Sequence, residues 1–486
     1  MSNKINNPFA LIKLAKTTTV CFDKSEICDG ELVIKNLVIL DPKNSESQVS
    51  QIIANVVNTT NEENPLIKAL KKQYDFEQSS VVKAVLPYDQ EKYLFGATFN
   101  GDKTFVIGLI ENVALKNKST ILKKCEEFLG QDVYVLGQAT GEVIDNSYNN
   151  EMDAIALIVV KEKIEESIPS SIKWLKENNI NVKLLSSEDA QKAASIAYEA
   201  GMESANRFTS LEGVSIEQTK TMVNQYTVFG DVSKEQRETI INSLENNGEK
   251  VLRYKKSFGD VPSVIENSRL FVNNLQRVGL LFIAKAILAV LLTLIFVFVT
   301  VSKAFEFPLN LYRFFIFSLI VDIITAVLLM LDKSQKESKD KFLMKVLKTS
   351  LPGAILMALS VAVMFILFVL QQNNMVDLGI YNNQTTSAMS AVSLAILGLP
   401  VLYNICTPLT KYRRLIVSGS VLLITIVLVI SAVISYTSNK TSPLFGIAFM
   451  EMNGPAYFAV GMTATLLAGL YFLLYKIFRK DEQNEN

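Results

Sequence analysis

The sequence contains no histidine, which removes the commonest general base and the commonest protein ligand of transition metals. Any chemistry must therefore rest on carboxylates, lysines, hydroxyl groups and a hard cation held by oxygen. Four cysteines, at positions 21, 28, 125 and 406, form no Cys-x-x-Cys pair, which suits a reducing cytosol. Net charge is absent as well, because 48 basic residues balance 48 acidic ones. The overall charge therefore predicts no nucleic-acid partner.

Apolar residues are abundant but unevenly spread along the 486 residues. The composition up to about Gln276 is typical of a soluble α/β protein, whereas apolar runs dominate beyond it. Residues 1–16 lack a sustained apolar core, so we expect no signal peptide before the soluble half. The second half has six segments that are long enough for a membrane helix, which needs about 20 residues: 280–302, 309–331, 351–370, 386–405, 416–435 and 455–477.

Basic residues collect in alternate connections of this apolar half. Lysines and arginines are frequent in 332–348, in 411–414 and in the tail from 476. The connections 371–385 and 436–454 together contain one lysine. The positive-inside rule then predicts a multi-pass protein of the cell membrane with both termini, and the soluble half, in the cytoplasm.

Asp322 is the conspicuous charge within the apolar segments. It lies near the middle of the second segment, where a lone carboxylate costs at least ~2.5 kcal/mol. Two interpretations stay open: Asp322 lines an ion path, or it is a structural carboxylate that is protonated, hydrogen-bonded or paired with Lys285. A divalent-cation site usually gathers several oxygen ligands, and only this carboxylate is visible.

The soluble half alternates strand-like and helical stretches. A first strand ending at residue 22 and later strand-like stretches, beginning with 154–160, are separated by helices of ten to fifteen residues. This pattern predicts a doubly wound parallel sheet in which 154–160 is the second strand. Residues 41–153 mix helices and strands around the hairpin signal Asn100-Gly101, so we expect an inserted α+β domain there.

The first strand ends in Asp23, at the edge where open α/β sheets place their chemistry. Residues 23–25, Asp-Lys-Ser, followed by Asp-Gly-Glu-Leu at 29–32, resemble the phosphorylation motif Asp-Lys-Thr-Gly-Thr of P-type ATPases. The resemblance implies that Asp23 accepts the γ-phosphate of ATP. The motif glycine is missing, however, and Glu26 stands where a threonine is expected.

Two further stretches resemble the nucleotide-binding domain of that family, in the expected order. Tyr88 belongs to a segment similar to the family's aromatic-led segment, which implies that its ring stacks on adenine. Residues 105–111 resemble the Lys-Gly-Ala-Pro-Glu loop, which implies nucleotide-binding roles for Gly108 and Glu111. Ile107 occupies the position of the loop's lysine, so one cationic contact to the nucleotide is absent.

The phosphate end of the site resembles the family too. Residues 186–189 are similar to Thr-Gly-Asp-Asn and keep, in Ser186, the hydroxyl that would hold the phosphoryl group. Arg237 stands for the phosphate-binding lysine. The segment similar to Thr-Gly-Asp-Gly-Val-Asn-Asp places Lys256 on its first, metal-binding aspartate and keeps Asp260 as the last.

The resemblance covers nearly the whole chain and, in the apolar half, points to bacterial cation pumps. It implies a phosphorylation domain of the haloacid dehalogenase-like fold, an inserted nucleotide-binding-like α+β domain, and an all-α domain of six membrane helices. The corresponding residues are 1–40 with 154–270, 41–153, and 271–486.

No cofactor follows from the residues alone, although the resemblance allows ATP and Mg²⁺, with Asp23 and Asp260 as metal ligands. Lys256 opposes this, since a unit-charge pair about 4 Å apart is worth roughly 4 kcal/mol at an effective dielectric of 20, and a divalent ion doubles it. We therefore expect Asp23 to form a structural ion pair with Lys256. Lys24, Ser186 and Arg237 would then be remnants of a catalytic site.

Two hypotheses follow. In the first, the chain is a half-length, catalytically impaired pseudo-ATPase that acts as the partner or regulatory subunit of another membrane protein. In the second, it is an ATP-dependent cation-transporting subunit, active when another chain supplies the actuator domain and the first four helices, which the resemblance leaves unaccounted for. A third alternative is that the sequence is a decayed gene fragment with no role.

Overall fold

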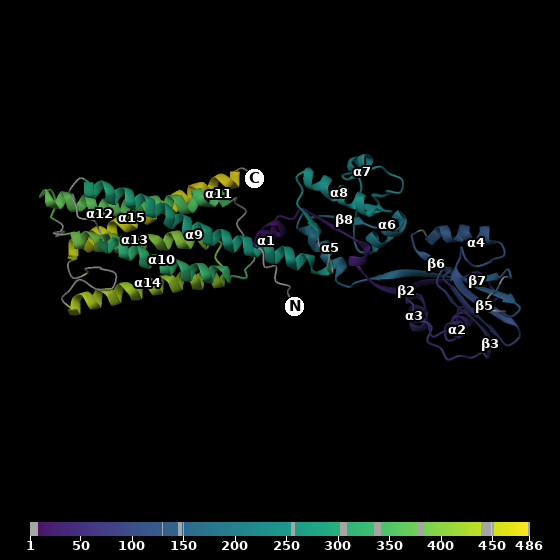
Figure 1. The fold of residues 1–486 in the computed structure, drawn as a ribbon. Coiled ribbons are helices and arrows are strands. Elements are labelled where there is room, and N and C mark those ends of the chain that lie inside the picture. The colour runs from purple at the N-terminus through teal and green to yellow at the C-terminus, as the bar shows by residue number, and fades with distance from the viewer. Residues whose placement is uncertain are drawn as a thin grey trace. The chain divides into compact units, whose positions relative to one another are not determined.

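The chain forms two compact units, residues 1–266 and 267–486, and Figure 1 labels their helices and strands. The first unit contains two β-sheets with their helices, and the second is built from helices. The computed structural model describes residues 8–128, 130–143, 148, 150–253, 258–301, 309–334, 342–377, 383–438, 449 and 452–484.

A five-stranded parallel sheet follows the predicted alternation of strands and helices. Its strand order is β11-β1-β8-β10-β9. Its strands are β1 (Thr19–Phe22), β8 (Asn181–Leu185), β9 (Phe208–Ser210), β10 (Val228–Gly230) and β11 (Val251–Arg253). The helical elements of this region are α1 (Pro8–Ala15), η1 (Lys24–Glu26), α5 (Ile168–Glu177), α6 (Ala190–Glu199), α7 (Ile216–Met222), α8 (Lys234–Asn246) and η3 (Phe258–Asp260).

Both faces of the parallel sheet are covered, which explains the apolar character of its strands. Val20 and Phe22 of β1 pack into the core that α5 and α6 share. Cys21 points to the opposite face and packs with apolar side chains of α8. The carboxyl ends of these strands therefore form one edge at which polar residues can meet.

A six-stranded antiparallel sheet forms the other half of the first unit. Its order is β2-β7-β6-β5-β4-β3. Its strands are β2 (Cys28–Ile39), β3 (Val82–Asp89), β4 (Leu94–Phe99), β5 (Lys103–Leu109), β6 (Asp132–Thr140) and β7 (Asp153–Ile164). Its helical elements are α2 (Glu46–Val57), α3 (Pro65–Gln73), α4 (Lys118–Cys125) and η2 (Glu126–Phe128). The predicted hairpin at Asn100-Gly101 is confirmed, because it joins β4 to β5 and Gly101 has φ +88°.

The expectation that residues 154–160 form the second strand of the parallel sheet is wrong. They are a strand, but β7 pairs antiparallel with β2 and β6. The reason is that β7 is buried on both faces: Ile158 packs into one core and Leu157 into another. A continuous apolar run indicates such double burial without revealing which sheet supplies the neighbours.

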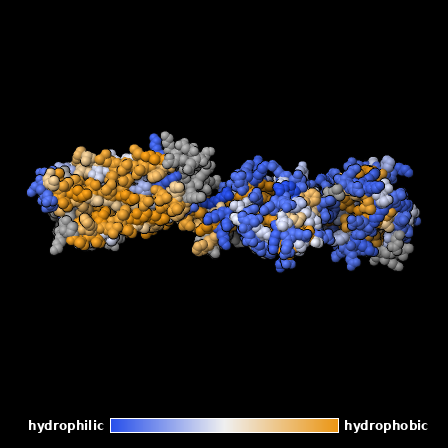
Figure 2. Space-filling model, turned by 90° about the horizontal axis from the view of Figure 1, so that it is seen from above, coloured by the Kyte–Doolittle hydropathy of each residue, from blue (hydrophilic) through white to orange (hydrophobic). Residues whose placement is uncertain are grey.

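The second unit consists of long apolar helices. They are α9 (Val261–Val301), α10 (Leu309–Met330), α12 (Leu351–Gln372), α13 (Asn383–Ile405), α14 (Lys411–Ser438) and α15 (Gly454–Asn484), with α11 (Phe342–Lys345) and a π-helical turn, η4 (Val346–Ser350), before α12. Each predicted span overlaps one of the long helices. Among the described residues, five helices are long and apolar enough to cross a membrane, and α10 contributes a shorter apolar stretch, Ser318–Met330. Figure 2 shows hydrophobic side chains over most of this unit's visible surface.

Candidate functional site

Asp23 lies at the carboxyl end of β1, where a fully buried strand meets solvent. One carboxylate oxygen, Oδ1, accepts hydrogen bonds from the amide and the hydroxyl of Ser25, both at 3.1 Å, and so caps η1. The other oxygen, Oδ2, accepts a hydrogen bond from the guanidinium of Arg237. Both oxygens of the predicted phosphate acceptor are therefore engaged within the chain.

Arg237 reaches Asp23 because α8 is fixed at its start. Ser233 and Gln236 form a capping box, and the Gln236 amide donates to two backbone carbonyls of the loop before α7, each at 2.9 Å. Arg237, in the first turn, also donates to the carbonyl of Leu185 at the end of β8. The guanidinium thus links the ends of two neighbouring strands. The predicted partner of Asp23, Lys256, lies outside the described residues, so that contact stays a prediction.

Lys24 lies between two carboxylates. Its Nζ is 2.5 Å from Glu162 Oε1 on β7 and also contacts Glu188 in the loop after β8. Burial disfavours the charged ammonium, but the hydrogen bonds from both carboxylates outweigh burial and raise the pKa of Lys24. The hydroxyl of the buried Ser186 accepts the amide of Glu188 at 3.1 Å and so shapes this loop. The structure therefore connects Lys24 and Ser186 through Glu188.

Glu26 and Cys28 adjoin this cluster, and neither was singled out for chemistry by the sequence. Burial raises the pKa of Glu26 to about 7, and the nearby Asp23 carboxylate adds to the effect while Arg237 opposes it. Burial, together with Glu162, raises the pKa of Cys28 to about 12, so this thiol is a poor nucleophile at neutral pH. The Asp23 neighbourhood is therefore a dense set of mutually compensating charges.

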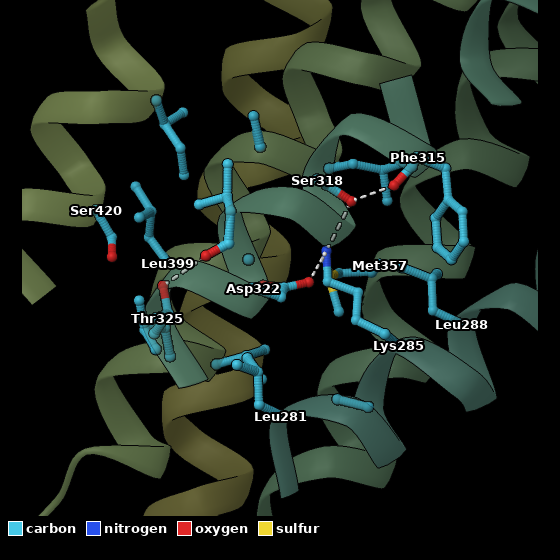
Figure 3. Close-up of a pocket in the computed structure, with 18 of the residues that line it drawn as sticks. Leu281, Lys285, Leu288, Phe315, Ser318, Asp322, Thr325, Met357, Leu399 and Ser420 are labelled. Atoms are coloured by element: carbon cyan, nitrogen blue, oxygen red, sulfur yellow. Dashed lines mark hydrogen bonds and ion pairs between the residues drawn. The ribbon is translucent and has the colours of Figure 1, made fainter. Parts of the chain in front are cut away.

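Asp322 lies in the helical unit. It pairs with Lys285, the partner that the structural interpretation of this aspartate named. Lys285 Nζ of α9 is 3.2 Å from Asp322 Oδ2 and 3.0 Å from the hydroxyl of Ser318, one turn earlier on α10. The ion pair faces a cavity of about 80 Å³ between α9, α10, α13 and α14. Figure 3 shows the lysine nitrogen between the oxygens of Asp322 and Ser318.

Comparison with known proteins finds relatives that match most of this chain in sequence. No family model matches the chain. The probable cation-transporting ATPase exp7 of Streptococcus pneumoniae serotype 4 is 19% identical over 461 residues, which cover 86% of this chain and 58% of that protein. The calcium-transporting ATPase CtpE of Mycolicibacterium smegmatis is 21% identical over 462 residues, covering 86% and 57%. The chain is therefore similar to cation-transporting P-type ATPases over most of its length. It spans about half the length of the curated relatives it matches.

The predicted Mg²⁺ site of this P-type ATPase relative does not fit the residues present. Both carboxylate oxygens of Asp23 already accept hydrogen bonds, one from Ser25 and the other from Arg237. Asp260 lies in η3 and is exposed, with its backbone carbonyl accepting the Ser263 hydroxyl at 2.8 Å. Over the part of the chain that the structure describes, no three or more Cys, Asp or Glu side chains form a metal-binding group. An ordinary two-carboxylate Mg²⁺ site would first require the Asp23–Arg237 pair to open.

The three predicted nucleotide-binding residues make the following contacts within the chain. Tyr88 packs against the core of the antiparallel sheet, with its ring centroid 6.2 Å from that of Phe95. Gly108 is required by packing, since a Cβ there would lie 2.7 Å from Leu94 Cβ. Glu111 is exposed, and its backbone carbonyl accepts Lys118 Nζ at 2.6 Å. Ile107, at the position of the family's lysine, is fully buried. Nucleotide binding by Tyr88, Gly108 and Glu111 stays a prediction.

Sequence reasoning missed an ion pair of the helical unit. Arg413 of α14 is fully buried and donates through Nε to Asp332 Oδ2 at 2.6 Å. Asn274 of α9 donates to the Asp332 carbonyl at 2.6 Å, which joins a third helix to the cluster. The basic run 411–414 was used only to predict the membrane topology. Nothing in this run distinguishes Arg413 from the other basic residues. The one sequence signal of this ion pair was Asp332, an acidic residue that follows directly after an apolar span.

Proposed function

We propose that this P-type ATPase relative is catalytically impaired and acts as the membrane partner or regulatory subunit of another membrane protein. The observation that carries the proposal is the Asp23–Arg237 pair, which occupies the carboxylate that would have to attack ATP. An aspartate held by an arginine is a weaker nucleophile than a free one, and here Oδ2 of Asp23 contacts the guanidinium while Oδ1 accepts from Ser25.

The sequence adds a second argument at the metal position. Phosphoryl transfer needs a divalent cation to neutralise the phosphate oxygens. Lys256 replaces the motif aspartate that would help to hold this cation. At about 4 Å, the change from attraction to repulsion is worth roughly 4 kcal/mol per unit charge at an effective dielectric of 20.

The domain assignment belongs to the same proposal. A haloacid dehalogenase-like phosphorylation domain would comprise 1–40 and 154–270, with the nucleotide-binding-like domain 41–153 inserted and the membrane domain 271–486 following. The parallel sheet, with its chemistry-bearing residues at the carboxyl ends of β1 and β8, supports the first assignment. The chain would cross the membrane several times, with both termini in the cytoplasm.

A specific observation favours the second candidate, an active pump assembled from two chains. Asp23 and Arg237 touch, and Ser186 follows Leu185, whose carbonyl accepts from Arg237. The predicted acceptor and phosphate-holding residues therefore lie at one edge, where a nucleotide and a second chain could rearrange them. The calcium-transporting relative CtpE makes Ca²⁺ the first cation to supply in testing this alternative.

The deciding experiment is incubation with γ-labelled ATP, Mg²⁺ and Ca²⁺, using the full chain alone and together with membranes from the source cell. We expect no acid-stable, hydroxylamine-labile label on this chain. Asp29→Asn is the matched control for Asp23→Asn, because Asp29 is a nearby carboxylate at the start of β2 that pairs with Lys163 instead. A label that survives Asp29→Asn and disappears in Asp23→Asn would contradict the catalytic impairment and favour the active pump.

The partner role needs its own measurement. Native electrophoresis of gently solubilised source membranes should show this chain in a complex larger than its own 54.1 kDa predicts, with a second membrane protein in the same band. A chain that migrates alone at every detergent concentration would contradict the regulatory role while leaving the absence of phosphorylation intact.

A further inference from the structure

The membrane cavity beside Asp322 contains its own positive charge. Among the described residues that line it, Lys285 and Asp322 are the titratable groups, and the remainder are apolar or carry hydroxyls. The ammonium approaches two oxygens, Asp322 Oδ2 and Ser318 Oγ, at 3.2 and 3.0 Å. Apart from this ion pair, Asp322 Oδ2 is buried and has no hydrogen-bond partner within the described part of the chain.

The hydroxyls around the pair are oriented as oxygen ligands. Ser318 donates its proton to the Phe315 carbonyl at 2.7 Å, and Thr325 donates to the Val321 carbonyl at 2.9 Å. Each hydroxyl oxygen consequently keeps its lone pairs for a positively charged neighbour. In Figure 3 the Lys285 nitrogen lies where such a neighbour is expected, between Ser318 and Asp322.

We propose that Lys285 is the specificity-determining residue of this cavity: its ammonium is the resident cation of Asp322 and keeps metal cations out. The lysine and aspartate together are neutral, so a metal ion entering beside them would bring uncompensated charge into a low-dielectric interior. A metal that displaced the ammonium would leave a lysine charge without its carboxylate. The proposal concerns the helical unit and does not depend on whether Asp23 is phosphorylated.

Removing the lysine charge should open the site. In Lys285→Met or Lys285→Gln, Asp322 retains one negative charge and the nearby hydroxyl oxygens, which suits one monovalent cation or one proton. We therefore expect equilibrium binding of radioactive Rb⁺ to the full chain in nanodiscs to be undetectable for the wild type and stoichiometric for either variant. Binding to the variants should strengthen as the pH rises from 6 to 9, because a proton competes with Rb⁺ for Asp322.

Matched variants make the outcome decisive. Lys285→Met with Asp322→Asn should lose Rb⁺ binding again, whereas Ser420→Ala, which changes a cavity hydroxyl on α14 without touching the pair, should behave as wild type. Thermal unfolding of every variant checks that the helices remain folded, and Lys285→Gln stands in if the methionine variant unfolds. Stoichiometric Rb⁺ or Ca²⁺ binding by the wild type at Asp322 would overturn the proposal. So would folded lysine variants that bind no Rb⁺ at any pH in the range.

Discussion

Two aspartates of this chain are each held by an arginine, but in opposite surroundings. Asp23 and Arg237, in the first unit, keep 25% and 29% of their side chains exposed. Asp332 and Arg413, in the helical unit, keep 1% and 0%. When the first pair separates, water can hydrate both charges and so replace most of the lost interaction energy. The charges of the second pair are out of reach of water, so their interaction energy is not replaced. We therefore expect the same chemical pair to contribute little stability at Asp23 and much more inside the helical unit.

Removing the buried arginine should have the largest effect. Arg413→Met leaves Asp332 without its counter-ion, and breaking a buried pair in this way typically costs about 3–5 kcal/mol. We expect the helical unit to unfold at much lower denaturant, measured by far-UV circular dichroism of the full chain in micelles. The adjacent Arg414→Met is the matched control, because Arg414 is exposed and should change little. Equal losses for the two variants would show that burial does not decide the difference.

The pH dependence of the first unit should depend on Glu26. Its pKa is raised from an ordinary 4.5 to about 7, so the folded state binds this proton more tightly than the unfolded chain does. The stability that this tighter proton binding contributes to the folded state is fully present below pH 4.5. It is lost as the pH rises through 7. After allowance for partial exposure, the loss is on the order of 1–3 kcal/mol.

Glu26→Gln should remove that slope and make the protein relatively more stable at pH 8 than at pH 5. The measurement is urea unfolding followed by the fluorescence of Trp174, the chain's single tryptophan, which packs against the core of the parallel sheet. A wild-type minus variant difference that stays constant from pH 5 to 8 would rule out Glu26 as the source.

The fold was largely predictable because its signals are local. Continuous apolar runs mark the long helices, and Asn100-Gly101 marks a hairpin whatever surrounds it. The sheet to which residues 154–160 belong was not predictable, since double burial has the same pattern in either sheet.

The site was predictable only as a list of residues. Asp23 and Arg237 were both expected to matter, but their contact joins positions 214 residues apart and depends on how α8 is capped. The sequence suggested Lys256 as the partner because the family resemblance places this lysine at the metal-binding position and its charge is opposite to that of Asp23. Arg413 was missed because a basic residue beside other basic residues carries no sign of burial.

A smaller effect is expected at Lys24, whose environment lies between the two extremes. Its side chain is 13% exposed, but its partner Glu188 is 43% exposed. Lys24→Met should leave two carboxylates facing each other and cost about 1 kcal/mol at neutral pH, again by Trp174 fluorescence. Lys176→Met, which removes the exposed pair with Glu203, should cost nothing measurable. If the two variants are indistinguishable, Lys24 makes no net contribution to the stability of the site.

The smallest effect should come from the residue around which the catalytic interpretation is built. Asp23→Asn keeps the cap on η1 and loses only a partly exposed ion pair, so we expect a change of about 0–1 kcal/mol. Salt separates the two pairs further: at about 1 M the Debye length is near 3 Å, which should abolish the Asp23→Asn effect while leaving that of Asp332→Asn in place. A salt-resistant loss of several kcal/mol for Asp23→Asn would instead mean that the Asp23–Arg237 pair has become a structural element as essential as the buried one.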